Sequence, residues 1–224
     1  MRALALALVL VLPAAPIAAQ QGAKPEINRP YVVDTDVARW NRSFSNERRE
    51  VYTKRDAIVA ATGAKPGMTV ADIGAGTGLF TLLFADAVKP GGSVVAVDIS
   101  PAFVEYIQET AKKRRMRNVT AIVGNGTEVG LPDESVDLVY LSDVYHHFEQ
   151  PAETLASIRK ALKPGGRMVV IDYERIPGVT PQARIDHVRL DKATAIREIG
   201  AAGFKLLEDK KLLRDNYFVV FQRP

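Results

Sequence analysis

The sequence of 224 residues predicts an open, doubly wound α/β sheet of seven strands, mostly parallel and with an antiparallel edge strand. Three observations support this fold. Short apolar, β-branched runs alternate with helix-length segments, which is the pattern of a parallel sheet covered by helices on both faces. A glycine-rich loop follows the first of these runs. Two apolar segments near the end of the chain are joined by a link short enough for an antiparallel return.

The expected elements follow one another along the chain. Strands are expected at residues 70–73, 94–98, 119–123, 136–141, 167–171, 204–207 and 217–221. Helices are expected at residues 78–88, 101–115, 152–162 and 189–202. The sequence Lys-Pro-Gly-Gly occurs twice, at 89–92 and 163–166, and is expected each time to end a helix and turn the chain into the next strand.

Residues 1–19 have the pattern of a secretory signal. Arg2 precedes an uncharged stretch of about ten apolar residues, and small residues lead to Ala19. Cleavage after Ala19 would start the mature chain at Gln20 and place the protein in the periplasm or outside the cell. An uncleaved anchor or a misassigned start codon is the alternative. Because a membrane span needs about 20 apolar residues, we expect no transmembrane helix.

The rest of the chain is expected to form an arm and one domain. Residues 20–36 contain prolines and few large apolar residues, and are expected to be irregular. The domain then covers residues 37–224. It begins with a helix at 37–62, capped by Asp34 or Asp36 and with a possible break near 43–46. The core at 63–172 follows, and the last helix and strands occupy 173–224.

Charge and composition narrow the function classes. The chain has 30 basic and 26 acidic residues, a net charge of +4 and a pI near 9.3. Because these charges are interspersed, we interpret the densest basic run, Lys112 to Arg115, as a solvated helix end, with an anionic substrate or membrane surface as the alternative. The absence of cysteine excludes disulfides, thiolate nucleophiles and thiolate metal ligands.

The glycine-rich loop and two acids carry the strongest functional signal. The loop reads Gly74-Ala75-Gly76-Thr77-Gly78, between the first strand and the next helix. This is G-x-G-x-G and not the G-x-G-x-x-G of dinucleotide sites. Asp72 precedes it, and a carboxylate there would repel a pyrophosphate but suit a ligand with an ammonium and a sulfonium. Asp98 ends the second strand, where it can accept hydrogen bonds from ribose hydroxyls.

With these residues, the chain resembles the class I S-adenosylmethionine-dependent methyltransferases, in the broad group of ubiquinone and menaquinone methyltransferases. The resemblance covers residues 55–172. It implies a Rossmann-like methyltransferase fold, S-adenosylmethionine as cofactor with S-adenosylhomocysteine as product, and no metal. It also implies that the glycines line the methionine moiety, that Asp98 holds the ribose and that Ile99 flanks the adenine. The implied cofactor-binding residues are Asp72, Gly74, Ala75, Gly76, Gly78, Asp98, Ile99, Asn125, Gly126 and Ser142.

One position departs from the family pattern. Asn125 follows the third strand where the family usually has an aspartate that receives the adenine amino group. An amide oxygen can accept the same hydrogen bond, so we expect the contact to be kept. Asp137, before the fourth strand, could be read as catalytic, but a structural role at the start of that strand is the preferred interpretation.

The catalytic candidates are Tyr145, His146 and His147, in the loop after the fourth strand. At least one histidine could orient the substrate or act as general base; capping a helix or bonding backbone is the structural alternative. A third metal ligand at short spacing is missing, so no metal is expected. His187 is interpreted as a surface residue. The loop after the fifth strand, at 172–175, is the second candidate region.

Trp40 and Phe44 are four residues apart on the first predicted helix, and could form a lid over the ligand or pack in the core. The leading functional hypothesis is an exported methyltransferase acting on a small-molecule or lipid-like acceptor. A non-catalytic protein that binds S-adenosylmethionine or S-adenosylhomocysteine is one alternative. A protein or nucleic-acid methyltransferase is another, favoured by the pI but opposed by the absence of an aromatic and basic platform. The acceptor and the oligomeric state stay open.

Overall fold

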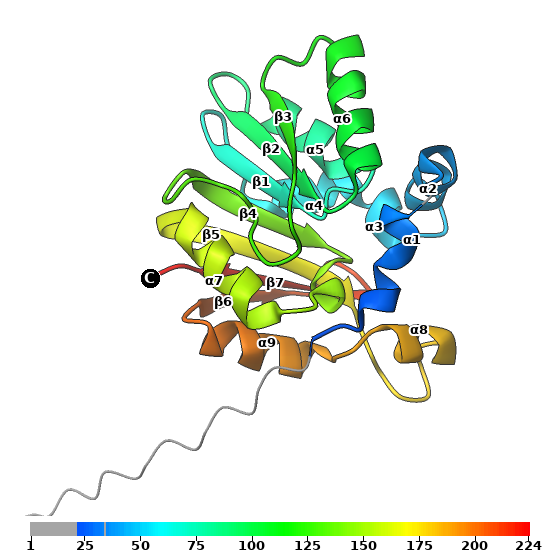
Figure 1. Ribbon diagram of the computed structural model, residues 1–224. Coiled ribbons are helices and arrows are strands. Elements are labelled where there is room, and N and C mark those ends of the chain that lie inside the picture. Colours follow the sequence, from blue (N-terminus) through cyan, green and yellow to red (C-terminus); the bar gives the residue numbers. More distant parts are fainter. Residues whose placement is uncertain (1–21, 34) are drawn as a thin grey trace, which may run out of the picture.

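The computed structural model describes residues 22–33 and 35–224, so the predicted leader and its cleavage site lie outside the described residues. Seven strands form one sheet in the order β3-β2-β1-β4-β5-β7-β6 (Figure 1). Strands β1 to β5 are parallel, whereas β7 is antiparallel to both β5 and β6. The predicted fold class is therefore confirmed. The strands are β1 Thr69–Ile73, β2 Ser93–Asp98, β3 Val119–Val123, β4 Val136–Ser142, β5 Leu162–Tyr173, β6 Lys205–Lys210 and β7 Asn216–Gln222.

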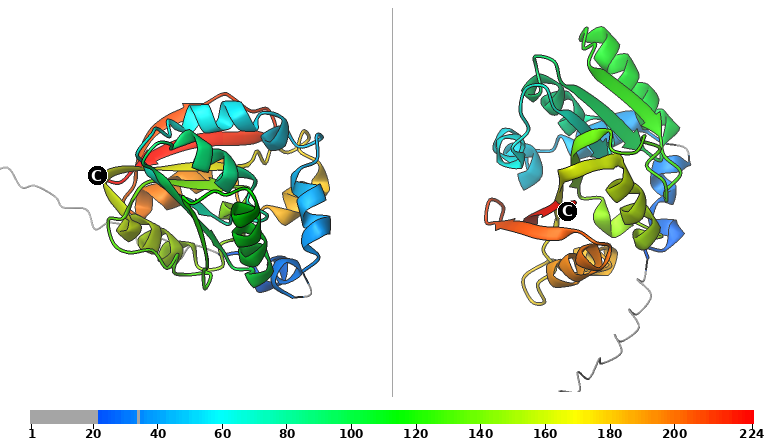
Figure 2. Two further views of the ribbon diagram at one scale, coloured as in Figure 1. Left: turned by 90° about the horizontal axis from the view of Figure 1, so that it is seen from above. Right: turned by 90° about the vertical axis from the view of Figure 1, so that its left-hand side faces the viewer.

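Helices cover both faces of this sheet (Figures 1 and 2). Successive strand residues point to opposite faces, so Val70 packs with Ile58 of α4 and Phe84 of α5, while Ala71 belongs to the cluster that contains Leu155 of α7. The helices are η1 Pro25–Ile27, α1 Arg29–Val32, α2 Val37–Phe44, α3 Glu50–Thr53, α4 Arg55–Thr62, α5 Leu79–Ala87, α6 Pro101–Lys113, η2 Tyr145–His147, α7 Pro151–Ala161, α8 Gln182–His187 and α9 Lys192–Ala201.

The N-terminal region differs in detail from the sequence prediction. The arm expected to be irregular contains two short helical segments, η1 and α1. The helix expected at 37–62 consists of α2, α3 and α4, with the first interruption after Phe44, close to the expected break. Asp36 caps α2 by accepting a hydrogen bond from the Arg39 amide at 2.9 Å. The left-handed backbone of Gly63, with φ of 72°, ends α4.

The second Lys-Pro-Gly-Gly segment, at 163–166, does not form the predicted turn. These residues lie inside β5, beside a shift in its register with β4 between Val136 and Leu138. The amide of Gly165 donates to the carbonyl of Arg223, whose own amide donates to the carbonyl of Gly166, each at 2.9 Å. The chain after β7 therefore supplies backbone partners that keep this irregular segment in the sheet.

The topology brings the loops that follow β1, β2, β3 and β4 to one edge of the sheet. Strands β1 and β4 are adjacent at the centre, and helices α1 and α2 stand beside that edge (Figure 1). In open α/β sheets this carboxyl edge is where ligands bind. Among the described residues, no helix has the length and apolar character needed to cross a membrane.

Candidate active site

A pocket of about 560 Å³ lies at the carboxyl edge of the sheet. It falls within the size range of small-molecule and cofactor sites. Nine of the ten predicted cofactor-binding residues line it; the exception is Gly78, which begins α5 and packs toward Ile107. The nine are Asp72, Gly74, Ala75, Gly76, Asp98, Ile99, Asn125, Gly126 and Ser142.

The glycine loop is held open toward the pocket by backbone hydrogen bonds. Gly74 has a φ of 69°, and its amide donates to the carbonyl of Val97 at 2.7 Å. A Cβ at Gly74 would lie 2.4 Å from Val144, in the loop after β4. Both the left-handed backbone and this close approach require glycine. The resulting cradle fits a ligand that lies against the backbone at the end of β1.

Asp98 connects the end of β2 to this loop. Its Oδ2 accepts a hydrogen bond from the Gly76 amide at 2.7 Å, and its Oδ1 accepts one from the Ser100 amide at 2.9 Å. The side chain is 7% exposed, and burial raises the pKa of Asp98 to about 6, although these amides favour the charged form. Each carboxylate oxygen can accept a further bond, so the predicted contact to ribose hydroxyls is compatible with this geometry.

Asp72 places a second buried carboxyl group at the pocket. Asp72 is 3% exposed, and its Oδ2 accepts a hydrogen bond from the Thr81 hydroxyl at 2.6 Å. Burial raises the pKa of Asp72 to about 7, and the nearby charge of Asp98 raises it further against the effect of Thr81. A cationic ligand beside these two buried carboxyl groups would favour their ionised, negatively charged form. This charge pattern fits the ammonium and sulfonium of S-adenosylmethionine.

Asn125 lines the pocket but uses its amide oxygen within its own loop. That oxygen accepts hydrogen bonds from the amides of Thr127 at 3.0 Å and Glu128 at 2.6 Å. The sequence predicted that this oxygen accepts a hydrogen bond from the adenine amino group. The loop therefore already engages this oxygen, and its contact with adenine stays a prediction.

The three predicted catalytic residues differ in burial and in whether they line the pocket. Tyr145 is fully buried in the core and donates its hydroxyl hydrogen bond to Glu198 at 2.9 Å, away from the pocket lining. The turn η2 thus directs Tyr145 into the sheet core and away from the pocket lining, and its catalytic role stays a prediction. His146 is also buried and outside the lining, whereas His147 lines the pocket.

Each of the two histidines has a fixed partner. The Nδ1 of His146 lies 2.7 Å from Asp172, at the end of β5, and the charge of Asp172 raises the pKa of His146 against the effect of burial. The Nδ1 of His147 lies 2.9 Å from the Oδ1 of Asn28 in the arm. Burial and the neighbouring His146 lower the pKa of His147 to about 3. His147 is therefore neutral at pH 7.

The pocket is also lined by an ion pair that the sequence did not predict. Arg49 and Asp143 are joined by a 2.5 Å contact, and Asn216 donates to the second oxygen of Asp143 at 2.6 Å. Both members of the pair line the pocket. Asp143 has a φ of 54°, a left-handed conformation that is uncommon outside glycine and often found at functional positions. Its place after β4 was a signal in the sequence, but Arg49, 94 residues earlier, offered none.

Aromatic residues of the N-terminal region lie beside the glycine loop, where a Cβ at Gly76 would be 2.9 Å from the ring of Phe44. Phe44 lines the pocket, with its ring centroid 6.1 Å from Phe103 of α6. Trp40 packs between Tyr31, at 4.6 Å, and Phe44, at 5.5 Å. Phe44 thus faces the pocket, as a lid residue would, and Trp40 supports it from behind.

Asp137 has the structural role that the sequence favoured. Its carboxylate accepts hydrogen bonds from the amide of Thr69 at 2.8 Å and from Lys163 at 2.7 Å. These contacts join the starts of β1, β4 and β5, at the edge of the sheet opposite to the pocket.

Comparison with known proteins agrees with the geometry. Residues 71–170 match the protein family described as "Methyltransferase domain". Demethylmenaquinone methyltransferase of Renibacterium salmoninarum is 35% identical over 119 residues, which cover 53% of this chain and 47% of that protein. The ubiquinone/menaquinone biosynthesis C-methyltransferase UbiE of Vibrio parahaemolyticus is 28% identical over 128 residues, which cover 57% and 49%. The chain spans about half the length of these relatives.

A crystal structure of a SAM dependent methyltransferase from Aquifex aeolicus has the same fold, with a TM-score of 0.76 and 21% identity over 84% of this chain and 99% of that one. The sheet order and the pocket agree with this likeness, and residues 71–170, a little under half of the chain, match the methyltransferase-domain family. The Aquifex aeolicus structure is described as SAM dependent, and Asp72, the glycine loop and Asp98 of this chain fit S-adenosylmethionine as the cofactor.

Proposed function

We propose that the protein transfers the methyl group of S-adenosylmethionine to a small, quinone-like or lipid-like acceptor. One observation carries this proposal: a single pocket extends from Asp72 and Asp98 to Phe44, Arg49 and Asp143. Asp72 and Asp98 fit the donor. Phe44, Arg49 and Asp143 add an aromatic ring and a charged pair beside the glycine loop, which fit an aromatic or lipid-like acceptor with a polar group. The names of the two quinone-pathway relatives support this class of acceptor.

The residues assigned to the acceptor have distinct chemical roles. When bound, S-adenosylmethionine supplies a methyl group on a positively charged sulfur, so the chain has to align the acceptor and exclude water. Of Asp143 and His147, Asp143 is the better base, because burial raises its pKa, whereas burial and the neighbouring His146 lower the pKa of His147 to about 3. We assign Asp143 to receive an acceptor proton at its carboxylate, Arg49 to hold that carboxylate in place, and His147 to orient the acceptor.

Calorimetry with S-adenosylmethionine and S-adenosylhomocysteine tests the donor half, and transfer of a radiolabelled methyl group to a panel of quinols and phenols tests the acceptor half. We expect binding of both ligands and label in at least one quinol-like product. Asp143→Asn should lower kcat strongly while donor affinity stays within about twofold. Folded protein that binds neither ligand would refute the donor site.

The two alternatives give different results in these assays. A non-catalytic binding protein would bind S-adenosylhomocysteine and transfer no label to any acceptor. A nucleic-acid or protein methyltransferase would label macromolecules. The pI favoured this alternative, but the densest basic run, which begins with Lys112 and Lys113 at the end of α6, is not part of the pocket lining.

We also propose that the protein is exported, on the basis of the leader at residues 1–19. N-terminal sequencing of protein recovered from the cell envelope tests this. We expect the mature chain to start at Gln20, and an intact Met1 would contradict cleavage. Because the donor is made in the cytoplasm, an exported enzyme needs a supply of it in its own compartment.

A further inference from the structure

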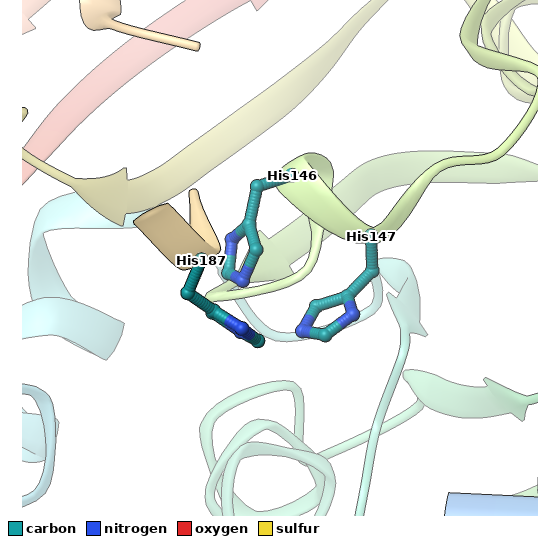
Figure 3. A group of neighbouring side chains, drawn as sticks. All are labelled: His146, His147 and His187. Atoms are coloured by element: carbon teal, nitrogen blue, oxygen red, sulfur yellow. The ribbon is translucent and has the colours of Figure 1, made fainter. Parts of the chain in front are cut away.

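All three histidines of the chain meet in one place. His146 and His147 lie on the turn η2, and His187 ends helix α8, forty residues later. The ring centroids are 4.2 Å apart for His146 and His147, and 5.1 and 5.4 Å from each of these to His187. One ligand nitrogen from each ring lies within 4.8 Å of the other two. Figure 3 shows the three rings arranged around a common space.

Hydrogen bonds fix which nitrogen of His146 and His147 faces that space. Asp172 accepts from the Nδ1 of His146, so the lone pair of this ring is on Nε2. The amide nitrogen of Asn28 donates to the carbonyl of His147 and to Glu149, which leaves its oxygen to accept from the Nδ1 of His147. Both rings therefore present Nε2 lone pairs. A carboxylate or amide that holds the far nitrogen is the usual second shell of a metal-ligating histidine.

A second, independent observation points to a ligand. His146 is 1% exposed, and its Nε2 is buried without a hydrogen-bond partner among the described residues. Buried polar atoms normally have a partner. In Figure 3 this nitrogen is directed to the space between the three rings. A bound cation there would satisfy it, and the buried charge of Asp172 behind the ring would attract that cation.

We propose that His146, His147 and His187 form a site for a divalent transition metal, with zinc as the best fit. Three imidazoles with an open fourth position are a known zinc ligand set, with Zn–N distances of about 2.0–2.1 Å. Tetrahedral geometry at that distance places the nitrogens about 3.3–3.4 Å apart, so the rings must close by about 1.5 Å. The exposed His187, on the short helix α8, can make this movement.

The chemistry of the surroundings agrees with a metal of this class. Imidazole favours zinc, copper and nickel over magnesium or calcium. His147 also lines the acceptor pocket, so the proposed ion lies beside the methyl acceptor. The proposal stands on the side chains alone and does not require methyl transfer.

Metal binding can be measured on the untagged mature chain, freed of metal by a chelator, since a histidine tag would bind the same ions. We expect calorimetry to give one equivalent of Zn²⁺, and Co²⁺ to give the visible absorption of a tetrahedral site. His187→Ala should weaken binding at least tenfold. The matched control is Gln182→Ala on the same helix, which should bind as the wild type does. Asp172→Asn should weaken binding by about 10- to 100-fold, as outer-shell changes do.

Two results would overturn the proposal: no zinc binding at micromolar concentrations by the wild-type chain, or equal zinc affinity in His187→Ala and the wild type. Calorimetry with S-adenosylmethionine on each variant checks that the chain is folded and separates failure of the metal site from failure of the donor site. In wild-type protein with ¹⁵N-labelled histidine, zinc should shift one ring nitrogen of all three residues. A shift confined to His187 would also contradict the site.

Discussion

Lowering the pH from 8 to 6 should weaken the binding of S-adenosylmethionine through Asp72. Burial raises the pKa of this carboxyl group to about 7 in the free protein. A cationic donor binds the ionised form, so its binding lowers the pKa and releases a proton. With a pKa of about 7, the ionised fraction falls from about 0.9 at pH 8 to about 0.09 at pH 6, which corresponds to about tenfold weaker binding, or about 1.4 kcal/mol.

Calorimetry across this pH range, in buffers of different ionisation enthalpy, measures both the affinity and the proton release. Asp72→Asn is the control, because its amide oxygen can still accept the hydrogen bond from Thr81. The amino group of the donor itself titrates near pH 8 with both proteins. The difference between the variant and the wild type therefore reports the contribution of Asp72. The variant should bind more weakly at pH 8 and lose most of the dependence between pH 6 and 8. An equal dependence in the variant and the wild type would refute the assignment to Asp72.

Three further predictions concern single contacts. Gly74→Ala should destabilise the fold by about 1–3 kcal/mol through left-handed backbone strain and the close approach of Val144; in urea unfolding, adding Val144→Ala should restore only part of this loss. Tyr145→Phe should cost about 1–2 kcal/mol in thermal unfolding, because Glu198 loses a buried partner, with kcat unchanged; a large fall in kcat would support the catalytic assignment. Asp98→Ala should weaken donor binding by about 1.5–3 kcal/mol, and unchanged affinity in calorimetry would mean that the ribose contact is misplaced.

The donor half of the site could be predicted because its signal is local. The loop from Gly74 to Gly78 and the acids Asp72 and Asp98 belong to two successive strand–loop units, and the carboxyl ends of adjacent parallel strands meet at one edge. The sheet order places these residues together once the strands are recognised. The hydrogen bonds that the Asn125 side chain makes within its own loop could not be predicted from residue type.

For the acceptor half of the site, the sequence indicated the loop but not which of its residues face the pocket. Tyr145, His146 and His147 are adjacent, but the turn η2 sends Tyr145 and His146 into the core and leaves His147 at the pocket. Periodicity does not specify the orientation of side chains on a single turn of this kind. The pairing of Arg49 with Asp143 joins segments 94 residues apart, so no local pattern indicates it.

The sequence by itself determined the class of fold, the donor loop and its acids, because strand periodicity, glycine spacing and terminal carboxylates are properties of neighbouring residues. Only the tertiary structure decided which residues face the acceptor, and that His187 joins the two histidines after β4. The sequence interpretation placed His187 at the surface and found no third ligand for a metal. The physical reason is that helix α8 brings His187 to within 5.1 and 5.4 Å of His146 and His147, measured between ring centroids. This contact depends on packing between elements that are distant in the chain.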